Sequence, residues 1–149
     1  MSASPNELIH RLYGEFWNER KLEVADQLIS QSHALTSAHI FGATVGPAGY
    51  KKQLQVFLTG FPDFQFAIDQ TISEKDKIAV MWTFTGTHQG GFLGIAPTNK
   101  SVSITGITVH QVADGKILDS LAMWDAISMF RQLGVELPIK LETRGVSAH

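Results

Sequence analysis

The chain has 149 residues, a formal net charge of −2 and 17% charged residues. A nearly balanced charge gives no general attraction to nucleic-acid phosphates or to anionic lipids, so both classes of partner are disfavoured. The sequence contains no cysteine, which excludes disulfides, thiolate nucleophiles and cysteine-ligated metals. The first residues form no signal core and no apolar run reaches the length of a membrane span, so we expect a cytoplasmic protein.

Three helices are predicted before residue 62. Residues 4–19 begin with a capping-box pattern, and apolar side chains then recur every three or four positions, which is typical of a helix with one buried face. Shorter helices are expected over 21–30 and 47–60, and Pro62 ends the last of them.

After Pro62 the apolar period changes from about 3.6 to about 2, which predicts β-strands. The expected strands lie within 64–69, 78–85, 101–113 and 116–125. Asp114-Gly115 indicates a tight hairpin turn between the last two strands, and a final helix is predicted over 126–133. Helices followed by antiparallel strands predict an α+β fold with helices on one face of a curved sheet.

Asp125 is the first candidate for an acid–base group. Along the predicted strand it shares the parity of Leu121 and Met123, so the alternation turns this carboxylate toward an apolar face. Burial there would favour the neutral carboxyl group and suit proton transfer near neutral pH. Asp is also a common helix cap, and the predicted helix begins at Ala126, so the sequence leaves both roles open.

Histidines on the predicted strands are further polar candidates. His110 shares the parity of Thr108 among apolar neighbours, and His88 lies where a strand runs into a glycine-rich loop. A single histidine in a strand is more often structural than catalytic, so both interpretations stand for each. His33 and His39 are six positions apart, a spacing that disfavours a structural zinc site, and we expect no metal.

The loop over 89–100 is apolar and rich in glycine, and it carries Phe92. No Walker lysine–hydroxyl pair follows it and no Rossmann spacing surrounds it, so it does not match a phosphate-binding loop. The composition favours either a flap over an apolar cavity or a long hairpin connection. The sequence also lacks a Gly-x-Ser-x-Gly elbow, which disfavours a serine hydrolase.

Three motifs together carry a family resemblance: GTHQGGFLGIAPT, ADGKI and the dipeptide WD near the end of the last predicted strand. With them, the sequence over about 62–134 resembles the SnoaL-like polyketide (ester) cyclases of the nuclear-transport-factor-2-like superfamily. The resemblance implies a single domain over 1–136 and a tail over 137–149. It also implies a cone-shaped half-barrel, in which a curved antiparallel sheet wraps over the N-terminal helices and encloses an apolar pocket.

The resemblance further implies an enzyme, a cyclase-like lyase or isomerase, that needs no cofactor and no metal. Such cyclases close a ring by aldol-type acid–base chemistry on a hydrophobic carbonyl or ester substrate. An aspartate near the end of the last strand and a histidine on the preceding strand correspond to Asp125 and His110. The residues expected to bind the substrate are Trp17, His39, Phe57, Trp82, His88, Phe92, Met123 and Trp124. Family members commonly associate through the outer face of the sheet, which implies a homodimer or larger homo-oligomer.

The sequence also departs from the family pattern. Ser120, Leu121 and Ala122 stand where many relatives carry His-Trp-acid, and Gly91 stands where many have Glu. We therefore expect a less polar pocket than in those relatives. Two alternatives follow: a non-catalytic module that binds a small hydrophobic molecule or dimerises, and an isomerase-like or epoxide-hydrolase-like enzyme of the same superfamily.

Overall fold

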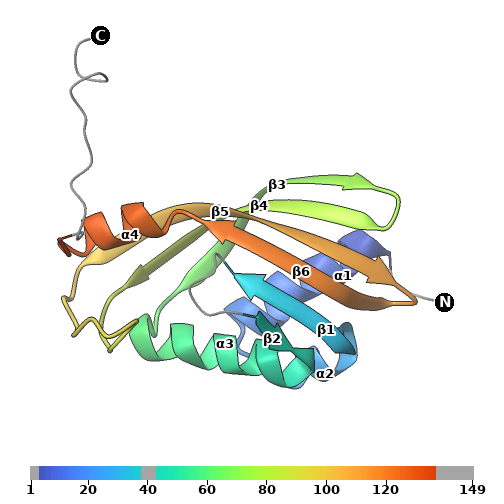
Figure 1. The fold of residues 1–149 in the computed structure, drawn as a ribbon, viewed down its shortest axis with the longest axis horizontal. Helices are drawn as coiled ribbons and strands as arrows, with labels where there is room; N and C mark the ends of the chain where they lie inside the picture. Colours follow the sequence, from blue (N-terminus) through green and yellow to red (C-terminus); the bar gives the residue numbers. More distant parts are fainter. Residues whose placement is uncertain (1–3, 38–42, 137–149) are drawn as a thin grey trace, which may run out of the picture.

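The computed structural model of the chain describes residues 4–37 and 43–136. The expected tail over 137–149 and His39 lie outside the described residues. Along the chain, the elements are α1 (Pro5–Arg11), η1 (Leu12–Asn18), α2 (Val24–Leu28), β1 (Ile29–Ser37), β2 (Ala43–Val45), α3 (Gly46–Gly60), β3 (Gln65–Glu74), β4 (Lys77–Thr87), β5 (Ser101–Ala113), β6 (Lys116–Trp124) and α4 (Ala126–Gln132) (Figure 1). The α+β class predicted from the order of periodicities is confirmed.

The N-terminal helical segment begins with the cap that the sequence indicates. The Ser4 side chain accepts a hydrogen bond from the backbone N–H of Glu7, and α1 continues directly into η1, a π-helix. The N–H of Glu19 donates to the carbonyl of Gly14, five residues earlier, at 3.0 Å. Such π segments occur mostly as short insertions and often lie at functional sites. Here η1 turns Tyr13 and Trp17 toward the interior.

The sheet has six strands among the described residues, in the order β2-β1-β6-β5-β4-β3. All its pairs are antiparallel except β1 with β6, which are parallel. The antiparallel pairing expected of the four strands after Pro62 is confirmed, and the parallel pair joins β6 to β1, a strand that the sequence did not predict. The helix expected over 21–30 ends at Leu28, and residues 29–30 belong to β1 instead. The segment 29–37 is rich in serine and lacks the clear apolar alternation that would predict a strand.

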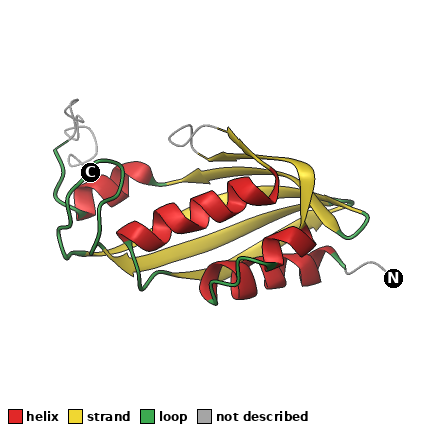
Figure 2. Ribbon diagram, turned by 90° about the horizontal axis from the view of Figure 1, so that it is seen from below, coloured by secondary structure: helices red, strands yellow, loops and turns green. Residues whose placement is uncertain are grey.

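The sheet is curved, and the helices of the first 60 residues lie over one of its faces (Figure 2). Inward side chains of the strands and the buried faces of α1, η1 and α3 form one hydrophobic core. β4 shows the underlying pattern, with buried and more exposed positions alternating along the strand. The outer face of the sheet carries exposed apolar side chains instead: Ile72, Ile107, Val109, Leu121 and Met123.

Candidate functional site

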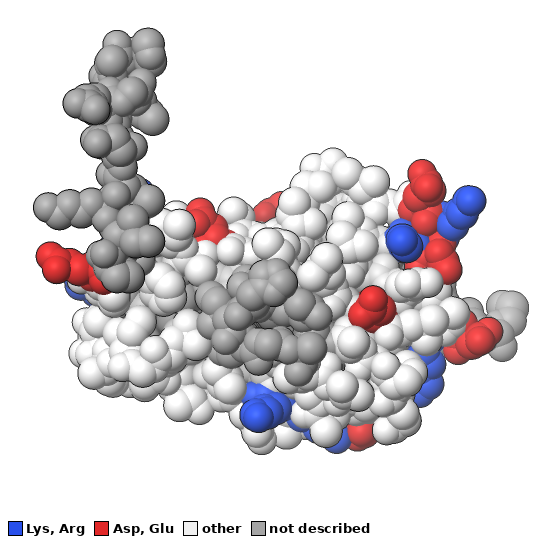
Figure 3. All heavy atoms as spheres, viewed as in Figure 1, with Lys and Arg blue, Asp and Glu red and all other residues white. Residues whose placement is uncertain are grey.

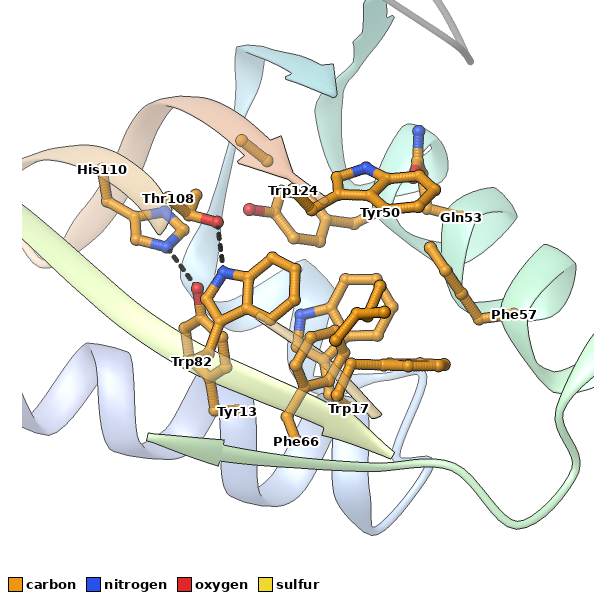
Figure 4. A pocket seen from close by; sticks show the side chains of 13 residues that line it. Tyr13, Trp17, Tyr50, Gln53, Phe57, Phe66, Trp82, Thr108, His110 and Trp124 are labelled. Atoms are coloured by element: carbon orange, nitrogen blue, oxygen red, sulfur yellow. Dashed lines mark hydrogen bonds between the residues drawn. The ribbon is translucent and has the colours of Figure 1, made fainter. Parts of the chain in front are cut away.

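A cavity lies between the inner face of the sheet and the helices η1 and α3. Its volume is about 50 Å³, several times the ~10–15 Å³ that one buried water needs by this measure. The apolar part of its wall is mostly aromatic: Trp17, Phe57, Phe66, Trp82, Phe84 and Trp124. Its polar part consists of Tyr13, Tyr50, Gln53, Thr108 and His110 (Figure 4). The cavity is narrow, so a ligand with several rings would have to displace side chains of the wall.

Edge-to-face aromatic contacts hold one side of the cavity. The ring of Trp17 lies 5.4 Å from that of Phe66 and 6.1 Å from that of Phe57, at steep angles between planes. Phe66 in turn meets Trp82 at 5.0 Å and 85°. Such pairs contribute about 0.5–1.5 kcal/mol each beyond the area that they bury. The wall is thus built from rings that fix one another's orientation.

Gly106 creates the space that Trp82 occupies. It lies opposite Trp82 in β4 and opposite Trp124 in β6. A Cβ atom on Gly106 would lie 2.3 Å from the ring of Trp82, so any side chain at this position would force that ring to move. The indole N–H of Trp82 then donates to the Thr108 hydroxyl at 2.9 Å, which orients the ring along the cavity wall (Figure 4).

A buried hydrogen-bond network forms the polar end of the cavity. The Tyr13 hydroxyl is 3.0 Å from Nε2 of His110, and Nδ1 of His110 is 2.7 Å from Oγ of Ser120. Ser120 Oγ also lies 2.9 Å from Nε2 of His33, and it accepts a hydrogen bond from the Tyr50 hydroxyl at 2.9 Å. Four separate elements, β1, α3, β5 and β6, therefore meet at one serine oxygen, and Tyr13 of η1 joins the network through His110.

Burial keeps this network uncharged near neutral pH. Loss of hydration, together with a smaller effect of the nearby His33, lowers the pKa of His110 to about 3. Burial also lowers the pKa of His33 to about 4, against a smaller upward effect of Asp119. Burial raises the pKa of both Tyr13 and Tyr50 above the usual value for tyrosine. The two imidazoles and the two phenols are neutral hydrogen-bonding groups rather than ions.

Five of the predicted site residues lie on the cavity wall: His110, Trp17, Phe57, Trp82 and Trp124. Their positions follow from one face of η1, one face of α3 and the inward positions of β4, β5 and β6. Whether each of them contacts a substrate stays a prediction.

Asp125 lies elsewhere, and its expected burial is wrong. The carboxylate is exposed and accepts a hydrogen bond from the backbone N–H of Ser128 at 3.0 Å, which makes it the cap of α4. Asp125 and Met123 border an open hollow on the outer face of the sheet, together with Ile107. The expected place of Met123 in the pocket is therefore also wrong. The odd-numbered apolar positions at the end of β6 face outward, where Leu121 is 47% and Met123 51% exposed.

His88 and Phe92 are buried but do not line the cavity. Nδ1 of His88 accepts a hydrogen bond from the backbone N–H of Thr98 at 3.2 Å, and the ring lies against Phe61 at 5.3 Å. Phe92 packs against Phe57, with ring centres 5.4 Å apart. The loop over 89–100 thus holds the end of α3 in place, and Phe92 supports the cavity wall from behind.

The network could not be predicted from the sequence because a β-bulge changes the register between β5 and β6. Counting outward from the turn at Asp114-Gly115 pairs His110 with Asp119, but the register shifts between Gln111 and Val112. His110 consequently faces Ser120, and the inward parity of β6 changes after the bulge. Ser120, which the sequence comparison with relatives marked as a loss of polarity, is the centre of the network.

The described residues contain no group of three or more His, Cys, Asp or Glu side chains placed to hold a metal ion. Within those same residues, no helix combines the length and the apolar character needed to cross a membrane.

The model of the SnoaL-like polyketide cyclase family matches residues 7–133 of the chain. No curated protein is a significant match. Among solved structures, a protein of Jannaschia sp. CCS1 assigned as a SnoaL-like polyketide cyclase has a TM-score of 0.81 at 21% identity, over 92% of this chain and 99% of its own. At this identity the similarity shows the fold alone.

Two similar structures come from Streptomyces. IdmH of Streptomyces antibioticus, assigned as a polyketide cyclase, has a TM-score of 0.78 at 25% identity, over 89% of this chain and 100% of its own. AclR of Streptomyces galilaeus, assigned as a hydroxylase, has a TM-score of 0.78 at 26% identity, over 97% of this chain and 92% of its own.

Proposed function

Because the chain belongs to the SnoaL-like polyketide cyclase family, we propose that it is an enzyme that closes a ring on a small hydrophobic carbonyl or ester compound. The observation that carries the proposal is the composition of the cavity wall. Aromatic rings surround most of the space, and the paired side chains of Tyr13 and His110 form its polar end. An apolar wall can hold a flexible chain folded, and a polar end can bind the oxygen on which charge develops.

The proposed reaction is an aldol-type ring closure that needs no cofactor. A proton leaves the carbon beside a carbonyl group, the resulting enolate attacks a second carbonyl carbon, and the alkoxide formed takes up a proton. Protons and electrons therefore balance without a co-reactant. Tyr13 is the group that would hydrogen-bond the oxygen gaining charge, and His110 would support it from behind.

The substrate is proposed to be a β-dicarbonyl compound. The side chains on the described part of the wall are neutral at neutral pH, so a strong base among them is absent. A methylene group between two carbonyl groups is acidic enough to lose its proton to water once its oxygen is hydrogen-bonded. The exposed Asp125 is assigned here to capping α4.

The test compares Tyr13→Phe with Asp125→Asn, with ring closure of a β-keto ester that carries a further ketone group followed by NMR, because substrate and product have the same mass. Loss of one hydrogen-bond donor to a developing oxyanion typically lowers the rate about 10²–10³-fold, so Tyr13→Phe should show a loss of that size. Asp125→Asn should keep the wild-type rate. A loss of about 10²–10⁴-fold in Asp125→Asn would contradict the proposal and restore the acid–base role of that carboxylate.

The neutral wall also favours a second candidate, a module that binds a small hydrophobic molecule without converting it. Binding needs only the aromatic wall and the hydrogen-bonding groups at its polar end. Under this alternative, Tyr13→Phe changes the dissociation constant of a bound carbonyl compound, and no product forms with the wild-type protein.

We also propose that two copies of the chain associate through the outer face of the sheet. Val109 lies opposite Leu121, and Ile107 opposite Met123, on neighbouring strands. All four side chains are between 39% and 51% exposed and form a continuous apolar patch. Figure 3 shows a mostly uncharged surface in this view, with charged side chains most crowded at the right-hand end, which fits the low charged fraction of the sequence.

A further inference from the structure

Ser120 lies at the centre of the buried network and has three hydrogen-bond partners. Its Oγ is 2.7 Å from Nδ1 of His110, 2.9 Å from Nε2 of His33 and 2.9 Å from the hydroxyl of Tyr50. The residue is 1% exposed, and both histidines are equally buried. Each of these contacts therefore has to be satisfied within the protein.

The hydrogen-bonding capacity of a serine hydroxyl makes the two histidines depend on each other. A hydroxyl group donates one hydrogen bond and accepts two. Tyr50 donates to Ser120 and uses one acceptor position. One donor and one acceptor position remain for His33 and His110. Hence one of the two facing nitrogens carries a proton and the other does not.

Two proton arrangements meet this condition, and they differ at Tyr13. In the first, His33 donates to Ser120, Ser120 donates to Nδ1 of His110, and Nε2–H of His110 donates to the Tyr13 oxygen. The Tyr13 proton is then available to a ligand. In the second, Ser120 donates to Nε2 of His33, Nδ1–H of His110 donates to Ser120, and the Tyr13 hydroxyl donates to Nε2 of His110.

The surroundings of His33 favour the first arrangement. Nδ1 of His33 is buried and has no hydrogen-bond partner among the described residues. In the second arrangement Nδ1 would carry the proton, and a buried N–H without a partner is rare in proteins. In the first arrangement the same atom is only an unused acceptor.

Thr108 also makes the Tyr13 hydroxyl a stronger hydrogen-bond donor. Its hydroxyl oxygen accepts the indole N–H of Trp82 at 2.9 Å and keeps its own proton to donate. A hydrogen bond from Thr108 lowers the pKa of Tyr13, against the larger upward effect of burial. In the first arrangement the Tyr13 oxygen accepts from His110, and accepting a hydrogen bond strengthens a hydroxyl as a donor.

We infer that Ser120 is a positioning residue that holds His110 as the Nε2–H tautomer, so that the Tyr13 hydroxyl donates its proton into the cavity. The ligand class that this arrangement selects has a hydrogen-bond acceptor at its polar end, a carbonyl or enolate oxygen. The inference rests on the proposed function for its ligand, but the tautomer of His110 is a property of the free protein.

The first experiment records the ¹⁵N signals of the histidine rings in the ligand-free protein. The expected result is an unprotonated Nδ1 and a protonated Nε2 for His110. Ser120→Ala should remove this preference, Ser120→Thr should keep it because the hydroxyl remains, and Ser73→Ala, at an exposed position of β3, should match wild type. A protonated Nδ1 in the wild-type protein overturns the inference, even if Ser120→Ala does not fold.

The second experiment measures binding of ethyl acetoacetate by calorimetry. Loss of one well-directed hydrogen bond should weaken its binding to Ser120→Ala about tenfold, with Ser120→Thr and Ser73→Ala close to wild type. Equal affinities of Ser120→Ala and the wild-type protein overturn the inference. If the wild-type protein binds no β-keto ester at all, the proposed function fails, whereas the spectrum still decides the role of Ser120.

Discussion

At the level of single residues, His33 and His110 should make the stability of the protein depend on pH. In the folded chain their pKa values are about 4 and about 3, whereas an unfolded histidine has a pKa of about 6.5. Below about pH 6.5 the unfolded chain binds protons that the folded chain does not. The free energy of unfolding should therefore fall as the pH falls, by about 1.4 kcal/mol per pH unit for each histidine.

Urea unfolding between about pH 7 and pH 4.5 measures this slope. His110→Gln should reduce the slope by about half, because one of the two buried histidines is gone. His10→Gln, at an exposed site on α1, controls for the replacement of a histidine as such. A free energy of unfolding that stays constant over the range would show that the two imidazoles are not held neutral.

Single residues also show where sequence reasoning stops. The family resemblance places Trp17 at the pocket, and its position on the apolar face of the first predicted helix is a pattern visible within a few residues. The contact between Tyr13 and His110 joins residues 97 positions apart, and that between His33 and Ser120 joins residues 87 apart. No local period reports such pairs, so the polar partners of His110 could not be found in this way.

At the level of elements, the bulge in the β5–β6 pair decides which face Asp125 takes. The sequence prediction assigns Leu121, Met123 and Asp125 to one face by alternation and takes that face to be the buried one. The register shift moves the inward positions to Ser120, Ala122 and Trp124, and Leu121 and Met123 turn outward. The strand itself was predicted almost to the residue, since its boundaries depend on the turn and not on the register.

β1 and β2 were missed for a different reason. β1 pairs with strands on both sides, and its buried polar side chain among the described residues, His33, belongs to the network. A strand that supplies hydrogen-bonding groups to the interior does not show the apolar alternation on which the prediction depends.

The close fit of Gly106 and Trp82 predicts the effect of adding one methyl group. In Gly106→Ala the new Cβ would meet the Trp82 ring and the carbonyl oxygen of Met123, so the ring has to move. Such overpacking costs about 1–3 kcal/mol of stability. It should also reduce the affinity of the cavity for ethyl acetoacetate. Urea unfolding and calorimetry test both expectations.

Gly91→Ala is the matched control, because a Cβ atom at Gly91 meets no atom within 4 Å. It should leave the free energy of unfolding and the ligand affinity close to wild type. Equal stability of Gly106→Ala and Gly91→Ala would mean that the sheet opens enough to accept the methyl group, and that this glycine does not fix the Trp82 ring.

At the level of the whole molecule, the architecture was the most predictable property. The change of period after Pro62 predicts the α+β class, and the three motifs point to the family whose model matches residues 7–133. The curved sheet over N-terminal helices agrees with both. The face of the sheet on which Asp125 lies depends on a register shift of a single residue, and a family pattern does not specify such a shift.

Association through the outer face can be tested with one substitution. Leu121→Lys places a charge in the middle of the apolar patch, opposite Val109, and should shift the protein toward the monomer. Val45→Lys makes the same kind of change on β2, where Val45 is 62% exposed and lies outside the patch. Light scattering on both variants and on the wild-type protein gives the mass of each. A monomeric wild-type protein at micromolar concentration would contradict the proposal.

The three tryptophans of the chain, Trp17, Trp82 and Trp124, all lie on the wall of one cavity. Indole emission changes in wavelength and intensity with the polarity of its surroundings and with nearby quenching groups. Every photon that the protein emits from tryptophan consequently originates beside the proposed binding space, with no background from a distant indole. A library of unlabelled carbonyl compounds can therefore be screened by intrinsic fluorescence alone, before any substrate is known.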